Sequence, residues 1–244
     1  MTPEKTIPSG EMQRVDQAPL TPDSSGAGLD LFWLPLGAGG WFVRLNGRIY
    51  EAVQAIRERR RPFDLYHTAL EVHLPQGRFV IENSWPIPDG DGRARGVTGE
   101  GPVGTRGLGR FRVLRYEVRR WRDGVIADAN WAVASPQRLS DDPSTAHRLL
   151  DLVPFVPRLV WGRDELGAGD MWNSNSVISW LLARSGLPAE AIRPPLGGRA
   201  PGWKAGLVAA RTLIGSDQGA PAWGVSEALT DLSGFERVGG RRLL

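Results

Sequence analysis

The chain has 244 residues, of which 41% are hydrophobic and 23% are charged, a composition typical of a globular protein with a sizeable core. It contains no cysteine, which excludes disulfides, thiolate metal sites and a cysteine nucleophile. The formal net charge is only +3 although the pI is near 9.8, and so small a net charge argues against a nucleic-acid partner. There is no apolar run of about 18 residues and no secretory signal in the polar N-terminus, so we expect a cytoplasmic protein without a membrane partner.

The three histidines, His67, His73 and His147, are widely spaced. None belongs to a spacing such as H-E-x-x-H that would place two ligands on one helix face. The sequence therefore predicts no metal site, and we expect no cofactor.

The N-terminal region, residues 1 to about 28, is rich in proline, serine and glycine, and predicts a disordered tail. Order is expected from Leu29, with a strand over 29–34, a loop over 37–40 and a helix over 48–60. The arginines that end this helix suit its last turn, where cations interact with the helix dipole. The alternative, a nucleic-acid patch, lacks an accompanying aromatic platform.

A hairpin is predicted next, from two β-rich runs over 63–74 and 78–82 that flank Pro75-Gln76-Gly77. Residues 86–110 are rich in glycine and proline, and predict a long loop that wraps the surface or covers a site. Gly99-x-Gly101-x-x-Gly104 within this loop matches a dinucleotide-binding fingerprint. We reject the match because Pro102 interrupts it and no helix follows.

The middle of the chain predicts a half-exposed strand over 111–121, a shorter strand around 129–134 and then a helix. Asp142 and Pro143 are typical of a helix N-cap and first turn, and Pro154 ends this helix. Its inward-facing residues are expected to be Ala146, Leu149, Leu150 and Val153, with His147 directed to solvent.

The following helix is expected to begin after Asn173 as N-cap and to end before Gly186 and Pro188. Its apolar stripe places Ser174 in the first turn, on the buried side. Trp172 and Trp180 are expected in the core. A helix over 202–213 and a weakly patterned end predict a helical extension over about 187–244.

Two short motifs resemble a known family. The segment Tyr66-His67-Thr68 opens a strand of the hairpin, and Asn173-Ser174-Asn175 opens a downstream helix. This order resembles the circularly permuted papain-like fold, as in the deSUMOylating-isopeptidase-like (PPPDE) group and the lecithin retinol acyltransferase-like group. Those families carry cysteine where this chain has Ser174.

The resemblance covers roughly residues 64–186. It implies an α+β fold, with an antiparallel sheet packed against helices. From the sequence as a whole we expect a single domain over 29–244.

The resemblance implies that Ser174 is a nucleophile and His67 its general base. A first-turn hydroxyl lies near the positive end of the helix dipole, but serine also needs a hydrogen-bonded base. If Pro75-Gln76 is a two-residue turn, Glu82 falls opposite Ala69 on the face of His67 and is the expected orienting group; a three-residue turn would change this face. Glu71 and His73 share that face and are weaker candidates.

The amides of Asn173 and Asn175 are candidates to bind an oxyanion or substrate, although helix capping explains them equally well. Ser174 is also explained as an ordinary first-turn serine, and His67 as a histidine satisfied within a sheet.

We therefore expect a hydrolase or acyl-transfer enzyme that acts on an amide, isopeptide or ester through Ser174 and His67, with a peptide or small-molecule substrate. The alternative is a catalytically inactive papain-like protein that binds a peptide or small molecule.

Overall fold

A computed structural model describes residues 26–36, 63–86, 96–195 and 197–212. All of them belong to a unit of the chain that ends at Thr212. The predicted tail up to residue 25, the loop over 37–40, the helix over 48–60, residues 87–95 of the predicted loop and the C-terminal 213–244 lie outside the described residues.

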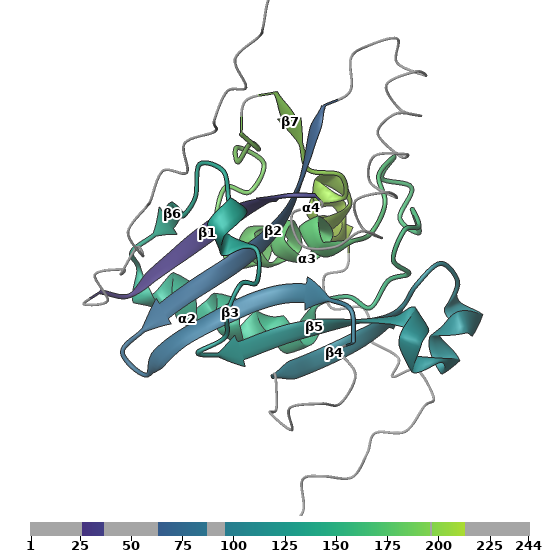
Figure 1. The fold of residues 1–244 in the computed structure, drawn as a ribbon, viewed down its shortest axis with the longest axis horizontal. Coiled ribbons are helices and arrows are strands. Elements are labelled where there is room, and N and C mark those ends of the chain that lie inside the picture. The colour runs from purple at the N-terminus through teal and green to yellow at the C-terminus, as the bar shows by residue number, and fades with distance from the viewer. Residues whose placement is uncertain (1–25, 37–62, 87–95, 196, 213–244) are drawn as a thin grey trace, which may run out of the picture. The chain divides into compact units, whose positions relative to one another are not determined.

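The described residues form an α+β fold, as predicted, around one mainly antiparallel sheet (Figure 1). Six strands lie in the order β4-β5-β3-β2-β1-β6, and the short β7 pairs in parallel with β2. Their bounds are β1 Gly28–Pro35, β2 Asp64–Leu74, β3 Gly77–Ser84, β4 Val97–Pro102, β5 Arg115–Arg122, β6 Gln137–Ser140 and β7 Gly198–Arg199.

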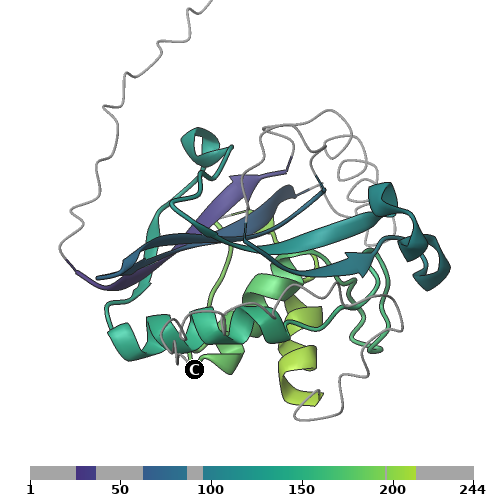
Figure 2. The ribbon, with the colours of Figure 1, turned by 90° about the horizontal axis from the view of Figure 1, so that it is seen from below.

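Three helices cover one face of the sheet, which we call the inner face (Figure 2). They are α2 Pro143–Leu152, α3 Ser174–Arg184 and α4 Trp203–Thr212. The opposite, outer face is covered in part by the segment 123–136, whose Ile126 packs in a cluster with Leu34, Ala69 and Val80.

The period-2 pattern of the strands decides which side chains enter each layer. On β1, Trp33 faces inward, where its ring lies 5.5 Å from that of Trp203 on α4. Trp33 pairs across the sheet with Thr68, and Leu34 pairs with His67. Thr68 therefore faces inward with Trp33, and His67 faces outward with Leu34.

The sheet divides between its two central strands. The β2–β3 ladder runs from Leu74–Gly77 to Leu70–Ile81 and then stops, although β2 extends back to Asp64 and β3 on to Ser84. Figure 1 shows the two strands leading away from their shared turn in different directions. We call the region of residues 64–69 and 82–84 the fork, and β7 pairs with its outermost part at Asp64.

Most of the expected elements are confirmed. The first strand, the hairpin with its two-residue turn, and the helices begin and end within a few residues of their predicted bounds. Asp142 caps α2 by accepting hydrogen bonds from the backbone N–H groups of Ser144 and Thr145. The expected inward residues of α2 are buried and His147 is exposed.

Two expected strands need correction. The strand predicted over 111–121 begins only at Arg115, because 3₁₀ turns occupy residues 106–110 and 112–114. It is not half-exposed, since Glu117 and Arg119 on its outer side are buried as an ion pair. The strand predicted around 129–134 is a 3₁₀ turn, Ala129–Trp131, and the strand of this region is β6.

The predicted loop over 86–110 contains the edge strand β4, which passes through the glycine motif. Proline is tolerated at the end of an edge strand, and Gly101 is required here because a Cβ would lie 2.2 Å from the Tyr116 ring. No helix of the described residues is long and apolar enough to cross a membrane.

Candidate functional site

The N-terminus of α3 is built as the sequence predicted, by an asparagine cap. The Asn173 Oδ1 accepts from the backbone N–H of Asn175 at 2.9 Å, and the Ser176 hydroxyl accepts from the backbone N–H of Asn173 at 3.0 Å. Ser174 is 7% exposed, on the buried side of the helix. Within the described part of the chain, its hydroxyl makes no hydrogen bond with another side chain.

Asn175 attaches this helix to the fork. Its Oδ1 accepts a hydrogen bond from the Thr68 hydroxyl at 2.9 Å, and its Nδ2 donates to the carbonyl oxygens of Tyr66 at 2.9 Å and Pro201 at 2.8 Å. Both amide hydrogens are therefore in use. This amide serves as a structural connection, which leaves it no donor for an oxyanion.

The position of α3 is also set by its contact with α4. The hydroxyls of Ser176 and Ser179 donate to the carbonyls of Gly202 and Trp203 at 2.7 and 2.8 Å. The helices approach so closely that a Cβ on Gly206 would lie 2.1 Å from the Ser176 carbonyl oxygen. The serines of α3 other than Ser174 are thus explained by helix packing.

The structure does not bring His67 and Ser174 together. Ser174 belongs to a helix on the inner face, which is bonded to the fork through Thr68. His67 is the neighbour of Thr68 in β2 and so points to the outer face, with Leu34 and Ala69. A contact with Ser174 would require His67 to face α3. Because side chains alternate along β2, Thr68 faces α3 instead.

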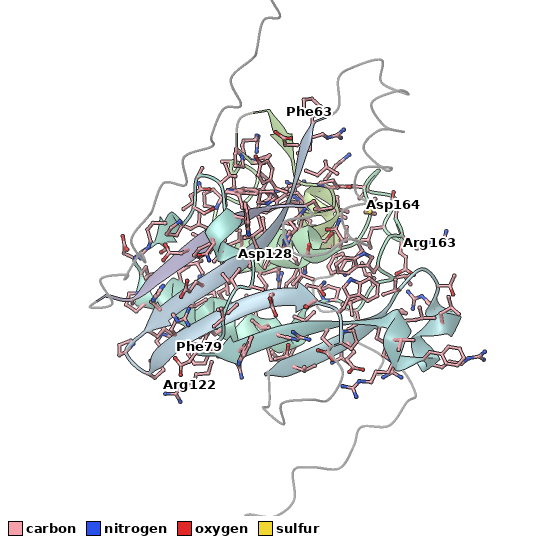
Figure 3. The ribbon with its side chains drawn as sticks, in the orientation of Figure 1. Phe63, Phe79, Arg122, Asp128, Arg163 and Asp164 are labelled. Atoms are coloured by element: carbon pink, nitrogen blue, oxygen red, sulfur yellow. The ribbon has the colours of Figure 1, made fainter. Side chains whose placement is uncertain are left out.

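The surroundings of His67 favour its neutral form. Burial lowers the pKa of the imidazole from its ordinary value to about 4, and the opposing effect of Asp128 is smaller. Asp128, labelled in Figure 3, belongs to the segment over the outer face. A histidine with so low a pKa is a weak general base.

Glu82 lies on the predicted face of the sheet but not in the predicted pair. Glu82 lies on the outer face of the sheet, as His67 does, but the pairing of β2 with β3 ends at Leu70 and Ile81, so Glu82 is not paired with Ala69. Its carboxylate accepts from the Arg119 guanidinium at 3.2 Å. Arg119, which is 1% exposed, also donates to Glu117.

The weaker candidates Glu71 and His73 also lie on the outer face. Glu71 forms an ion pair with Arg78, and His73 Nε2 lies 3.4 Å from Asp30. Arg138 completes this group by binding the Asp30 carboxylate at 2.6 Å. The outer face therefore holds paired charges.

The inner face of the fork carries a polar side chain that the sequence analysis did not single out. Asn83 follows Ile81 on the inward side of β3, opposite Val118 of β5. It is 9% exposed, and among the described residues neither its Nδ2 nor its Oδ1 has a hydrogen-bond partner. An unpaired buried donor or acceptor costs about 1–3 kcal/mol, so such an amide is unusual in a folded protein.

The direction of Ser174 follows from the neighbours of α3. Successive helical residues turn by about 100°. Ser176 and Ser179 face α4, and Asn175 faces β2, so the step back to Ser174 leads away from α4 toward β3, which α3 also contacts. Ser174 therefore lies on the side of α3 that is turned away from α4, where α3 contacts β3 and α2.

Aromatic rings extend from this region to the surface. The Tyr116 ring lies 5.6 Å from that of Trp161, which lies 6.1 Å from that of Trp85. Tyr116 is 1% exposed and Trp85 is 42% exposed, so the row runs from the interior outward. Trp172, next to the Asn173 cap and buried as predicted, donates from Nε1 to the Tyr116 hydroxyl at 3.2 Å.

Asp170 is the carboxylate nearest in sequence to Ser174 and is already engaged. It accepts hydrogen bonds from the backbone N–H groups of Met171, Gly202 and Lys204, which joins the starts of α3 and α4. Burial raises the pKa of this carboxyl above its ordinary value, and those N–H groups oppose the rise. Its oxygens serve the backbone, so it is not a base directed at Ser174.

A signal for Asn83 was present in the sequence. Phe79, Ile81 and Asn83 alternate along β3, which places an asparagine on an otherwise apolar face. Asparagine is depleted in strands, and its presence there called for an explanation. The aromatic row has no comparable signal, because its members come from separate segments.

Three comparisons with known proteins give no relative for this chain: no family model matches it, and no curated protein or solved structure is similar to it. Among the described residues, no group of three histidine, aspartate or glutamate side chains is arranged to hold a metal ion.

Proposed function

We propose that this chain is a non-catalytic binding domain that holds an amide or carboxyl group of a peptide or small molecule at the fork, between Asn83 and Ser174. The observation that carries the proposal is the unpartnered amide of Asn83, which is nine-tenths buried. A carboxamide, a peptide bond or a protonated carboxyl donates and accepts side by side, which is what the Asn83 amide requires.

The start of α3 supports the same ligand chemistry. A carbonyl or carboxylate oxygen is favoured at a helix N-terminus by the helix dipole. The Ser174 hydroxyl adds a donor and an acceptor that the described side chains leave unused. Rings such as Tyr116 and Trp161 would contact the apolar part of the ligand, in keeping with sites that combine apolar walls with a few polar groups.

Hydrolysis by Ser174 is less well supported, because the described residues place no general base beside it and few free N–H donors for an oxyanion. Of the three histidines, His67 and His73 point to the outer face and His147 is exposed on α2. A serine nucleophile depends on such a base. The backbone N–H groups of Asn175 and Ser176 already donate to Asn173, so the first turn of α3 offers few free donors to an oxyanion.

The test is a titration of the ¹⁵N-labelled protein with N-acetylated amino-acid amides, aromatic and aliphatic, observed by NMR. We expect a saturable shift of the Asn83 side-chain amide signals, larger for the aromatic amides. We expect the Asn83→Leu variant not to bind. The exposed Asn130 is the matched control, and its replacement by alanine should leave binding unchanged.

Labelling with a fluorophosphonate probe and mass spectrometry separates binding from catalysis. The proposal predicts no modification of Ser174 in the folded protein. Labelling of Ser174 that disappears in Ser174→Ala and His67→Ala would overturn it in favour of a serine hydrolase. The absence of any shift at Asn83 across the amide series would also contradict it.

A further inference from the structure

The chain leaves the sheet between β4 and β5 in an exposed segment, residues 103–114, which we call the basic excursion. It consists of two 3₁₀ turns (Figure 1, beyond the ends of β4 and β5). The backbone N–H of Val103 donates to the carbonyl of Leu114 at 2.9 Å, which closes its base. The basic excursion is separate from the fork, so a role for it is independent of the proposed function.

The basic excursion combines positive charge with exposed apolar side chains. Residues 103–114 contain three arginines and no acidic residue, and one of the three, Arg106, forms an ion pair with Glu165. Phe111 is 47% exposed and Val113 is 77% exposed, and the Arg110 guanidinium lies 4.7 Å from the centre of the Phe111 ring. Exposed apolar residues that gather in one segment mark interaction sites more often than isolated ones do.

The segment is held firmly at its base. Gly109 is buried against Pro102, where a Cβ would lie 2.9 Å from the proline ring. Arg163, labelled in Figure 3, donates to the carbonyl of Gly104 at 2.7 Å. Its outer side chains are thus presented by a fixed backbone, which lowers the entropy lost on binding.

We infer that the basic excursion docks on an anionic membrane surface. Phe111, Val113 and Leu108 would enter the boundary between headgroups and acyl chains, while Arg110 beside them binds a lipid phosphate. Charge complementarity and aliphatic exposure together select this partner. Single-stranded nucleic acid is also anionic, but its bases stack on aromatic rings and would not bury the exposed aliphatic side chains of Val113 and Leu108.

This inference departs from the expectation, drawn from composition, that the chain has no membrane partner. That expectation rested on the lack of a long apolar run, which bears on a helix that crosses a membrane. A surface contact needs only a local group of apolar and basic side chains, which the fold assembles from about ten residues.

The test is co-sedimentation of the full chain with vesicles of phosphatidylcholine alone and with added phosphatidylglycerol. We expect binding only to the anionic vesicles, and weaker binding as salt is raised. The Phe111→Ser, Val113→Ser double variant should bind about tenfold more weakly. Arg110→Ala should bind about fivefold more weakly.

Two exposed residues elsewhere provide matched controls. Val125 is 64% exposed, and the Arg122 side chain is 66% exposed at the other end of β5, so Val125→Ser and Arg122→Ala should bind as the unmodified chain does. Circular dichroism checks that each variant is folded. Equal binding to neutral vesicles, or equal losses of binding in the controls, would overturn the inference. So would a chain that binds no vesicles, whether or not it binds single-stranded RNA.

Discussion

The two faces of the sheet hold their buried polar side chains in opposite ways. On the outer face, Arg119 is shared by Glu117 and Glu82, and Arg138 binds Asp30. On the inner face at the fork, Asn83 is 9% exposed and has no partner among the described residues. Most buried polar groups of a folded protein are paired, so the unpaired amide of Asn83 is the observation on which the proposed ligand site rests.

The largest effect is expected on the outer face. Arg119→Met leaves the Glu117 carboxylate buried without its cation, so the free energy of unfolding should fall by about 3–5 kcal/mol. Urea denaturation measures it. Arg122→Met on the same strand, where the side chain is exposed, is the control and should change the stability by less than about 0.5 kcal/mol. Equal losses of stability in Arg119→Met and Arg122→Met would contradict a buried ion pair at Arg119.

On the inner face, Asn175 is the paired counterpart of Asn83. Asn175→Leu removes three hydrogen bonds and strands the Thr68 hydroxyl and the Tyr66 carbonyl, so the free energy of unfolding should fall by about 3 kcal/mol. Thr68→Val removes one of these bonds and should cost about 1 kcal/mol. A variant as stable as the parent would mean that α3 is held to the fork by apolar packing alone.

The free energy of unfolding should depend on pH through His67. Because the pKa of His67 is about 4 in the fold and near 6.5 when unfolded, the unfolded chain binds more protons between these values. The associated stability is complete above pH 6.5 and is lost as pH falls toward 4, by up to about 3 kcal/mol.

Chemical denaturation across this range, compared with His67→Leu, isolates the contribution of His67. The variant should show a flatter pH profile, whereas His147→Gln, at an exposed position, should keep the original slope. A profile unchanged in His67→Leu would show that His67 is hydrated in the folded state.

Sequence patterns were sufficient for most elements of this fold but not for the composition of the site. Alternation, turn residues and caps predicted β1, the hairpin, α2 and α3, because each depends on neighbours in the chain. The residue of β2 that contacts α3 is decided by how these two distant segments pack. A shift of β2 by one residue would turn His67 inward and Thr68 outward. Ser174 was placed correctly and its proposed partner was not brought to it.

The charged outer face was missed for a related reason. Arg119 belongs to a strand that was predicted to be half-exposed, yet it is buried and bonded to Glu82 and Trp85, which are distant in sequence. Asn83 could have been found from the alternation of β3. Its lack of a partner is a property of the folded chain alone.

The most direct test of a ligand site at the fork is the free energy of unfolding of Asn83→Leu in the absence of ligand. Leucine matches asparagine in size and needs no hydrogen bond, so replacing an unpaired buried amide should raise the free energy of unfolding by about 1–2 kcal/mol. The same exchange at Asn175 should lower it. A loss of stability in Asn83→Leu comparable to that in Asn175→Leu would show that Asn83 is already paired within the protein, and would contradict a ligand site at the fork.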